Sequence, residues 1–137
     1  MFKLLMLTAM FVGLGMAQDD PEMTNGLRNG RFWQARTHAE KLYMLMGVRE
    51  GLIASGNYDK FKIFIGSNGT FGDYLKALDQ FYDDPANLAI QIIGAIGVYT
   101  AKVNGAEADD IAKRVAAWRR LAKEADDTPA KPTVVKQ

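Results

Sequence analysis

The amino-acid sequence predicts an all-α protein, a single compact bundle of four to five helices after a cleaved N-terminal signal peptide. Apolar residues recur at three- and four-residue spacing over most of the chain, and capping residues precede several of these segments. Cysteine is absent, so packing alone must stabilise the fold. A chain of 137 residues is long enough to bury a core without disulfides.

The N-terminus is typical of an export signal. Lys3 is followed by the apolar run Leu4 to Met16, which is too short to cross a bilayer, since a spanning helix needs about 20 residues. The segment Gly15-Met16-Ala17 then supplies small residues before a polar stretch that begins at Gln18. This pattern predicts cleavage after Ala17. An uncleaved N-terminal anchor helix is the alternative.

The sequence predicts three parts of the chain. They are a signal peptide (1–17), one α-helical domain (18–125) that starts with a short flexible leader, and a disordered C-terminal tail (126–137) with two prolines. We expect the mature protein to be periplasmic or secreted, without a stable membrane span.

The mature chain is electrically neutral. Lys3 leaves with the signal peptide, so 16 of the 17 basic residues remain against 16 acidic ones. Because phosphate contacts dominate nucleic-acid binding and require basic residues, a nucleic-acid partner is not expected. One basic cluster, diluted by acidic neighbours, is typical of a solvated helix face: Arg114, Arg119, Arg120 and Lys123.

Two helices begin with predicted capping boxes, in which a threonine and an acidic side chain three residues later each bond the other's free backbone N–H group. Thr37 and Glu40 open a helix with an apolar stripe over roughly 17 residues. Thr70 and Asp73 open the next helix, and Asp84-Pro85 ends it.

Three further helices are predicted from apolar periodicity. They cover residues 25–35, 88–103 and 108–125, and the second is apolar almost all round, which is typical of a central buried helix. Residues 58–65 alternate in polarity like a short strand. Because no partner strand is visible, we expect an irregular or helical connection there.

A strip of small residues marks the first long helix. Gly47 and Gly51 are four residues apart and lie on one side with Tyr43. Glycine has no Cβ, so another backbone or ring can approach closely. We expect this strip to receive another helix of the domain, and the helix that carries Phe81 and Tyr82 is the first candidate.

Residue types suited to nucleophilic catalysis or metal binding are scarce. The chain has no cysteine, two serines and a single histidine, His38, which follows a helix cap. Neither a serine–histidine–acid triad nor a zinc site is expected from this set, and no cofactor is predicted.

An exported protein meets the cell wall, so a cell-wall glycan hydrolase is the enzymatic alternative. Such an enzyme uses two carboxyl groups, one of them kept protonated by apolar surroundings. Glu50 is the candidate general acid, with Glu40 or Asp73 as its partner. The other interpretation of Glu50 is a buried or half-buried salt bridge to Arg31 or Arg36.

Several short motifs resemble a group of small exported bacterial proteins of unknown function. They are G-x-x-W (Gly30, Trp33), a segment similar to K-x-x-Y that starts at Lys41, G-x-x-x-G (Gly47, Gly51) and F-Y-x-D-P-x-N (81–87). The likeness covers about residues 26–105 and extends distantly to the Tai-type immunity proteins of type VI secretion. Those are periplasmic α-helical domains that bind and block a toxic partner. The resemblance implies a helical fold and a protein partner, and it supplies no catalytic residue.

The sequence thus favours an exported, non-enzymatic helical binding protein that binds and blocks an envelope or toxin protein. Exposed aromatic and arginine side chains concentrate binding energy in such contacts. The candidate contact residues are Trp33, Arg36, Tyr58 and Tyr82. A structural envelope protein without a specific ligand is a third interpretation.

Overall fold

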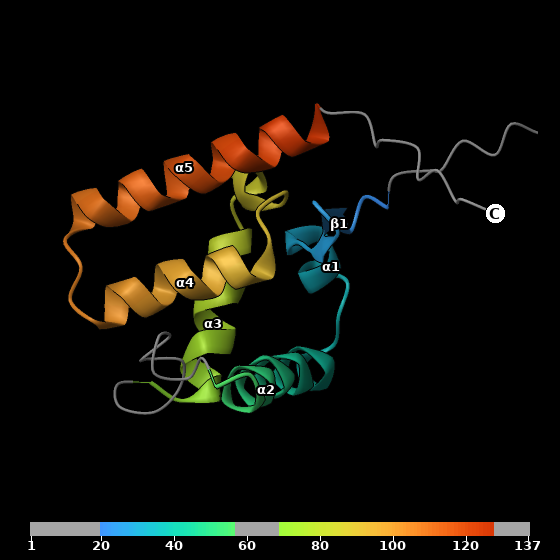
Figure 1. Cartoon of the computed structure of the whole chain (residues 1–137), viewed down its shortest axis with the longest axis vertical. Helices are drawn as coiled ribbons and strands as arrows, with labels where there is room; N and C mark the ends of the chain where they lie inside the picture. The colour runs from blue at the N-terminus through green and yellow to red at the C-terminus, as the bar shows by residue number, and fades with distance from the viewer. Residues whose placement is uncertain (1–19, 57–68, 128–137) are drawn as a thin grey trace, which may run out of the picture.

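Helices dominate the protein, as the sequence predicts (Figure 1). The computed structural model describes residues 20–56 and 69–127. The elements in chain order are β1 (Met23–Thr24), β2 (Leu27–Arg28), α1 (Gly30–Gln34), α2 (His38–Ala54), α3 (Phe71–Tyr82), the 3-10 helix η1 (Pro85–Asn87), α4 (Ile92–Val103) and α5 (Ala108–Asp126). The predicted signal peptide (1–17), the alternating segment 58–65 and residues 128–137 of the predicted tail lie outside the described residues.

Two helices begin at the capping boxes predicted for them. The Thr37 hydroxyl accepts the Glu40 backbone N–H at 3.3 Å, and the Glu40 carboxylate accepts the Thr37 N–H at 2.7 Å. Thr70 and Asp73 exchange the same two bonds at 3.2 and 2.8 Å. Gly56 follows the end of α2 with a φ of +67°, which favours glycine, so the predicted end of this helix is also confirmed.

The N-terminal part differs from its prediction, because residues 20–29 form a short hairpin instead of a flexible leader and the start of a helix. β1 and β2 pair antiparallel around Asn25-Gly26, and both turn residues have positive φ, as a two-residue hairpin turn requires. The side chain of Asn29 then accepts two backbone N–H groups from the first turn of α1. The helix predicted over 25–35 therefore begins only at Gly30.

The start of α4 also lies later than predicted. Gln91 is extended, forms a β-bridge with Asn29 and donates its side-chain N–H to the Thr24 carbonyl at 2.8 Å. The Thr24 hydroxyl donates to the Ala89 carbonyl at 2.8 Å. These bonds hold the hairpin against the connection before α4, so that connection is not helical.

α3 lies at the centre of the helical part. It contacts α1, α2 and α4, and α5 covers α4 (Figure 1). The helix predicted to be central and buried, residues 88–103, forms α4, which lies between α3 and α5 and has five buried residues. The buried hydrophobic core around α3 contains Trp33, Leu45, Tyr74, Leu75, Leu78, Tyr82, Ile92, Ala95 and Ile96.

Candidate functional site

Two of the four predicted contact residues lie in the core and not on the surface. The side chains of Trp33 and Tyr82 are both 0% exposed, so the expectation that they are exposed was wrong. The Trp33 indole N–H donates to the Asp79 carboxylate at 2.8 Å, and the Tyr82 hydroxyl donates to the Ile90 carbonyl at 3.1 Å. These bonds satisfy the polar atom of each ring, which lets both aromatic residues be fully buried. Tyr58 lies outside the described residues.

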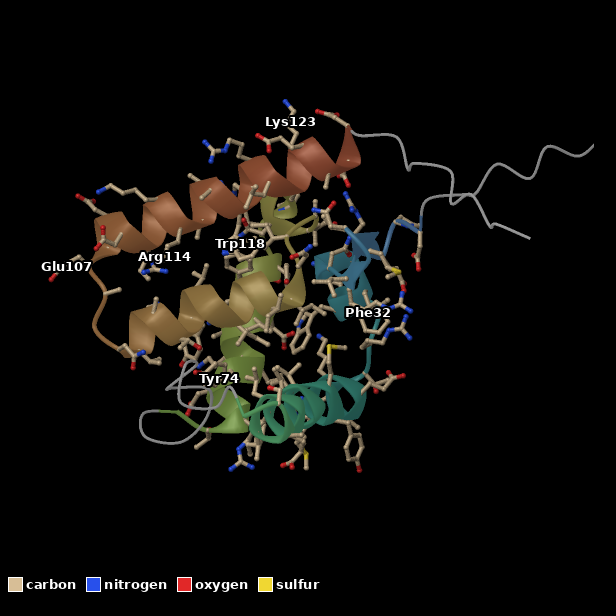
Figure 2. All side chains as sticks on the ribbon, viewed as in Figure 1. Phe32, Tyr74, Glu107, Arg114, Trp118 and Lys123 are labelled. Carbon is tan, nitrogen blue, oxygen red and sulfur yellow. The ribbon has the colours of Figure 1, made fainter. Side chains whose placement is uncertain are left out.

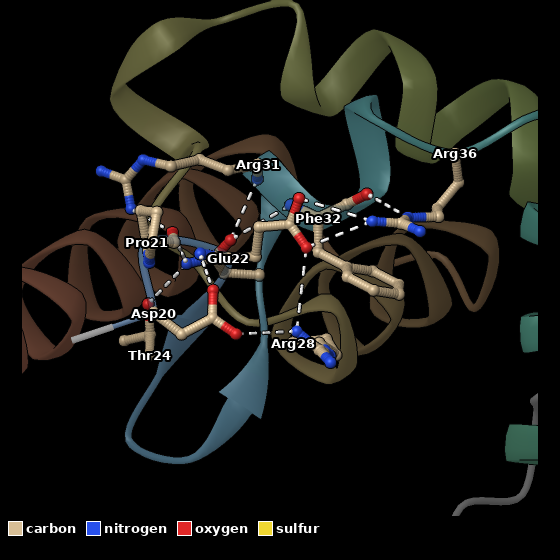
Figure 3. A network of polar contacts seen from close by, with 9 residues as sticks. Asp20, Pro21, Glu22, Thr24, Arg28, Arg31, Phe32 and Arg36 are labelled. Atoms are coloured by element: carbon tan, nitrogen blue, oxygen red, sulfur yellow. Dashed lines mark hydrogen bonds and ion pairs between the residues drawn. The ribbon is translucent and has the colours of Figure 1, made fainter. Parts of the chain in front are cut away.

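Arg36, the fourth predicted contact residue, is half-buried in an intramolecular network (Figure 3). Its guanidinium lies 4.2 Å from the ring centre of Phe32, and that of Arg28 lies 4.5 Å from the same centre. The Glu22 carboxylate pairs with Arg36 at 3.2 Å and with Arg28 at 3.8 Å. This network binds the N-terminal segment to α1, so its arginines are already engaged within the protein.

The surroundings of Glu50 do not match either prediction for it. Its side chain is 71% exposed and pairs with its neighbour Arg49 at 3.4 Å, not with Arg31 or Arg36. A carboxyl group needs an apolar setting to stay protonated near neutral pH, and Glu50 lacks that setting. The expected apolar environment of this candidate acid was therefore wrong.

The two candidate partner carboxylates act as helix caps. The backbone N–H and hydroxyl of Thr37 bond Glu40 and lower the pKa of that carboxyl. The same groups of Thr70 lower the pKa of Asp73. Both side chains are therefore ionised at neutral pH, and each is directed at the start of its own helix.

The strip of Tyr43, Gly47 and Gly51 does not receive another helix in the described part of the chain. Tyr43 is 70% exposed, and a Cβ added to either glycine would meet no atom within 4 Å. α2 instead turns the face with Leu45, which is 0% exposed, toward the core. The expected packing was wrong because the apolar stripe of this helix lies on a different side from its glycines.

Potential metal ligands are dispersed over residues 20–56 and 69–127. In these ranges, no three His, Asp or Glu side chains lie close enough together to hold a metal ion. His38 is exposed at the first residue of α2. The same ranges contain no helix of the length and apolar character that crossing a membrane requires.

A groove of about 670 Å³ lies where α3, α4 and α5 meet. Ligand pockets commonly have volumes of about 300–1,000 Å³ and are mostly apolar. The walls of this groove carry Asp73, Lys76, Ala77, Gln80 and Phe81 from α3, Ala95, Val98, Tyr99, Lys102 and Val103 from α4, and Ile111 and Val115 from α5. In size and composition the groove resembles a ligand site.

Differences in side-chain size along α5 leave this space open. Trp118 packs against Gly94, where an added Cβ would lie 2.9 Å from the indole ring, so α5 closes on α4 at this point (Figure 2). Earlier in α5 the smaller Val115 and Ile111 line the groove. The apolar face predicted for this helix is therefore only partly covered by α4.

The charged groups of the groove gather at one end. The hydroxyls of Tyr74 and Thr100 bond each other at 3.0 Å, which places the start of α3 beside the end of α4. Lys76 and Lys102 each lie two residues beyond one of these hydroxyls and line the groove. Both lysines therefore lie at the same end, opposite the end that contains Phe81.

The charge at this end of the groove is net positive. Asp73 is the one acidic residue among the lining residues, and its carboxylate accepts the Thr70 N–H and hydroxyl, each at 2.8 Å. Neither Lys76 nor Lys102 forms an ion pair of 4.0 Å or less with another described residue. The bonds with Thr70 lower the pKa of Asp73, and the charge of Lys76 adds to this effect, so the two charges interact. The two lysines outnumber Asp73, so the net charge at this end favours a negatively charged group.

No family model, no curated protein and no solved structure matches this chain. The fold and the groove define the class of protein, a mostly helical protein with an apolar groove that is basic at one end. The groove could not be predicted from the sequence, because its lining comes from three helices whose packing no local pattern reveals.

Proposed function

We propose that this protein is an exported, non-enzymatic binding protein of the periplasm or the extracellular space, and that it binds an envelope component in the groove between α3, α4 and α5. The observation that carries the proposal is the groove itself, which has a volume of about 670 Å³ and a mostly apolar lining. Apolar surface exposed in a concavity is typical of a binding site, since burying it on association is favourable.

The groove replaces the contact surface expected from the sequence. Trp33 and Tyr82 are buried and Arg36 is engaged by Glu22, so none of the three is free to recognise a partner. A protein that this chain binds and blocks, as the immunity proteins do, would have to place apolar side chains in the groove beside Phe81 and Tyr99.

A photo-crosslinking experiment in cells tests this proposal. A photoreactive amino acid replaces Ala77, which lines the groove, or Ala116, which lies exposed on α5 and does not line it. We expect an adduct from position 77 and none from position 116, and its mass shows whether the bound component is a lipid or a protein. Equal adducts from both positions, or none from position 77, would overturn the proposal.

A further inference from the structure

The charges along the groove are distributed as an elongated ligand with one charged end would require. Phe81 and Ala95 belong to the uncharged end, which also carries the side-chain amide of Gln80, since the end of α3 and the start of α4 lie away from the Tyr74–Thr100 contact. Lys76 and Lys102 belong to the other end. A ligand that matches this pattern has an apolar body and a single anionic group.

An extended peptide fits the floor of the groove poorly. The walls of the groove are helices, whose backbone N–H and C=O groups are already paired within each helix. A peptide strand laid on such walls would bury its own backbone polar groups without partners, which costs free energy for each group. An acyl chain has no polar groups along its length and avoids this cost.

We propose that the groove binds a single-chain lipid with an anionic headgroup, such as a fatty acid. The acyl chain lies on the apolar floor toward Phe81, and the headgroup lies between the ammonium groups of Lys76 and Lys102. This inference rests on the proposed function and specifies the component that the groove binds. The charge complementarity between one anion and two lysines selects against neutral and cationic amphiphiles of the same length.

Binding of three twelve-carbon ligands to the full mature chain tests this inference. Dodecanoate, dodecanol and dodecylammonium compete, below their aggregation concentrations, with a fluorescent fatty acid probe. We expect dodecanoate to bind tightest and dodecylammonium weakest. The double variant Lys76→Gln/Lys102→Gln should lose about fivefold to tenfold in dodecanoate affinity, as expected for two exposed charge pairs.

A matched control removes two lysines elsewhere. Lys113 and Lys123 lie exposed on α5 and do not line the groove, so Lys113→Gln/Lys123→Gln should bind dodecanoate like the wild type. A groove-filling variant, Ala77→Phe, should weaken binding of both dodecanoate and dodecanol, whereas Ala116→Phe should not. Melting temperatures of all variants confirm that each one folds.

Different experimental results would overturn the lipid-anion inference and the proposed function. Equal affinity for dodecanoate and dodecanol, or unchanged dodecanoate binding by the Lys76/Lys102 variant, would overturn the lipid-anion inference while the groove remains a binding site. A protein adduct from position 77, together with no binding of any twelve-carbon ligand, would also overturn the inference and leave the proposed function standing. The absence of any adduct at position 77 would overturn the proposed function itself.

Discussion

Single glycines in this protein have opposite effects on packing. Gly30 begins α1 directly against the ring of Tyr82, and an added Cβ would collide with that ring and approach the Leu88 backbone to 3.0 Å. Gly47 lies on the open side of α2, where a Cβ would meet nothing within 4 Å. The G-x-x-W motif is thus a packing motif, whereas the glycine strip of α2 is surface.

This difference predicts opposite effects of alanine at the two positions. Gly30→Ala should destabilise the protein by roughly 1–3 kcal/mol, because the buried Tyr82 ring must move to admit a methyl group. Gly47→Ala should stabilise it by about 0.5–1 kcal/mol, because alanine favours the helix and finds free space. Urea unfolding of both variants measures the two changes. A stabilising Gly30→Ala would show that α1 does not pack against Tyr82 in this way.

At the scale of elements, local sequence signals predicted the helices but not the helix boundaries that depend on contacts between distant residues. The capping pairs that start with Thr37 and Thr70 were sufficient to place two helix starts, because each bonds within its own first turn. The late start of α4 depends on the bridge between Asn29 and Gln91, which are far apart in the sequence. No local pattern in residues 88–103 contains that information.

The F-Y-x-D-P-x-N motif links three elements and makes a prediction about stability. Asn87 is 5% exposed, donates to the Phe81 carbonyl at 2.7 Å and accepts from Arg119 at 2.8 Å. Asn87→Ala should destabilise the protein by roughly 1–3 kcal/mol, because it leaves polar groups without partners. Asn104→Ala, at the exposed end of α4, should change stability by less than about 0.5 kcal/mol. Thermal unfolding that is equal for both variants would contradict this role of the motif.

At the scale of the whole molecule, the ends of the described chain are held to the fold. Asp20 accepts the Glu22 N–H at 2.9 Å and pairs with Arg28 at 3.1 Å. Arg31 pairs with Asp126 at 4.0 Å, which brings the end of α5 to α1. The helical class was predictable from periodicity, but the groove was not, since it depends on how three helices pack together.

The predicted cleavage site leaves these contacts intact, because only Gln18 and Asp19 would precede the bonded Asp20. We propose, from the sequence pattern of residues 1–17, that the mature protein starts at Gln18 and is found in the periplasm or the medium. Intact-mass measurement on the fractionated protein checks this prediction. A full-length chain that retains Met1 in the cytosol would contradict export.

The most direct test of fatty-acid binding in the groove is an amide NMR titration of the mature protein with dodecanoate. Binding between α3, α4 and α5 predicts that the largest shift changes occur at Ala77, Val98, Lys102 and Val115, with little change at Tyr43 and Gly47 on α2. Saturable changes centred on α2, or no changes at the groove residues, would contradict the account.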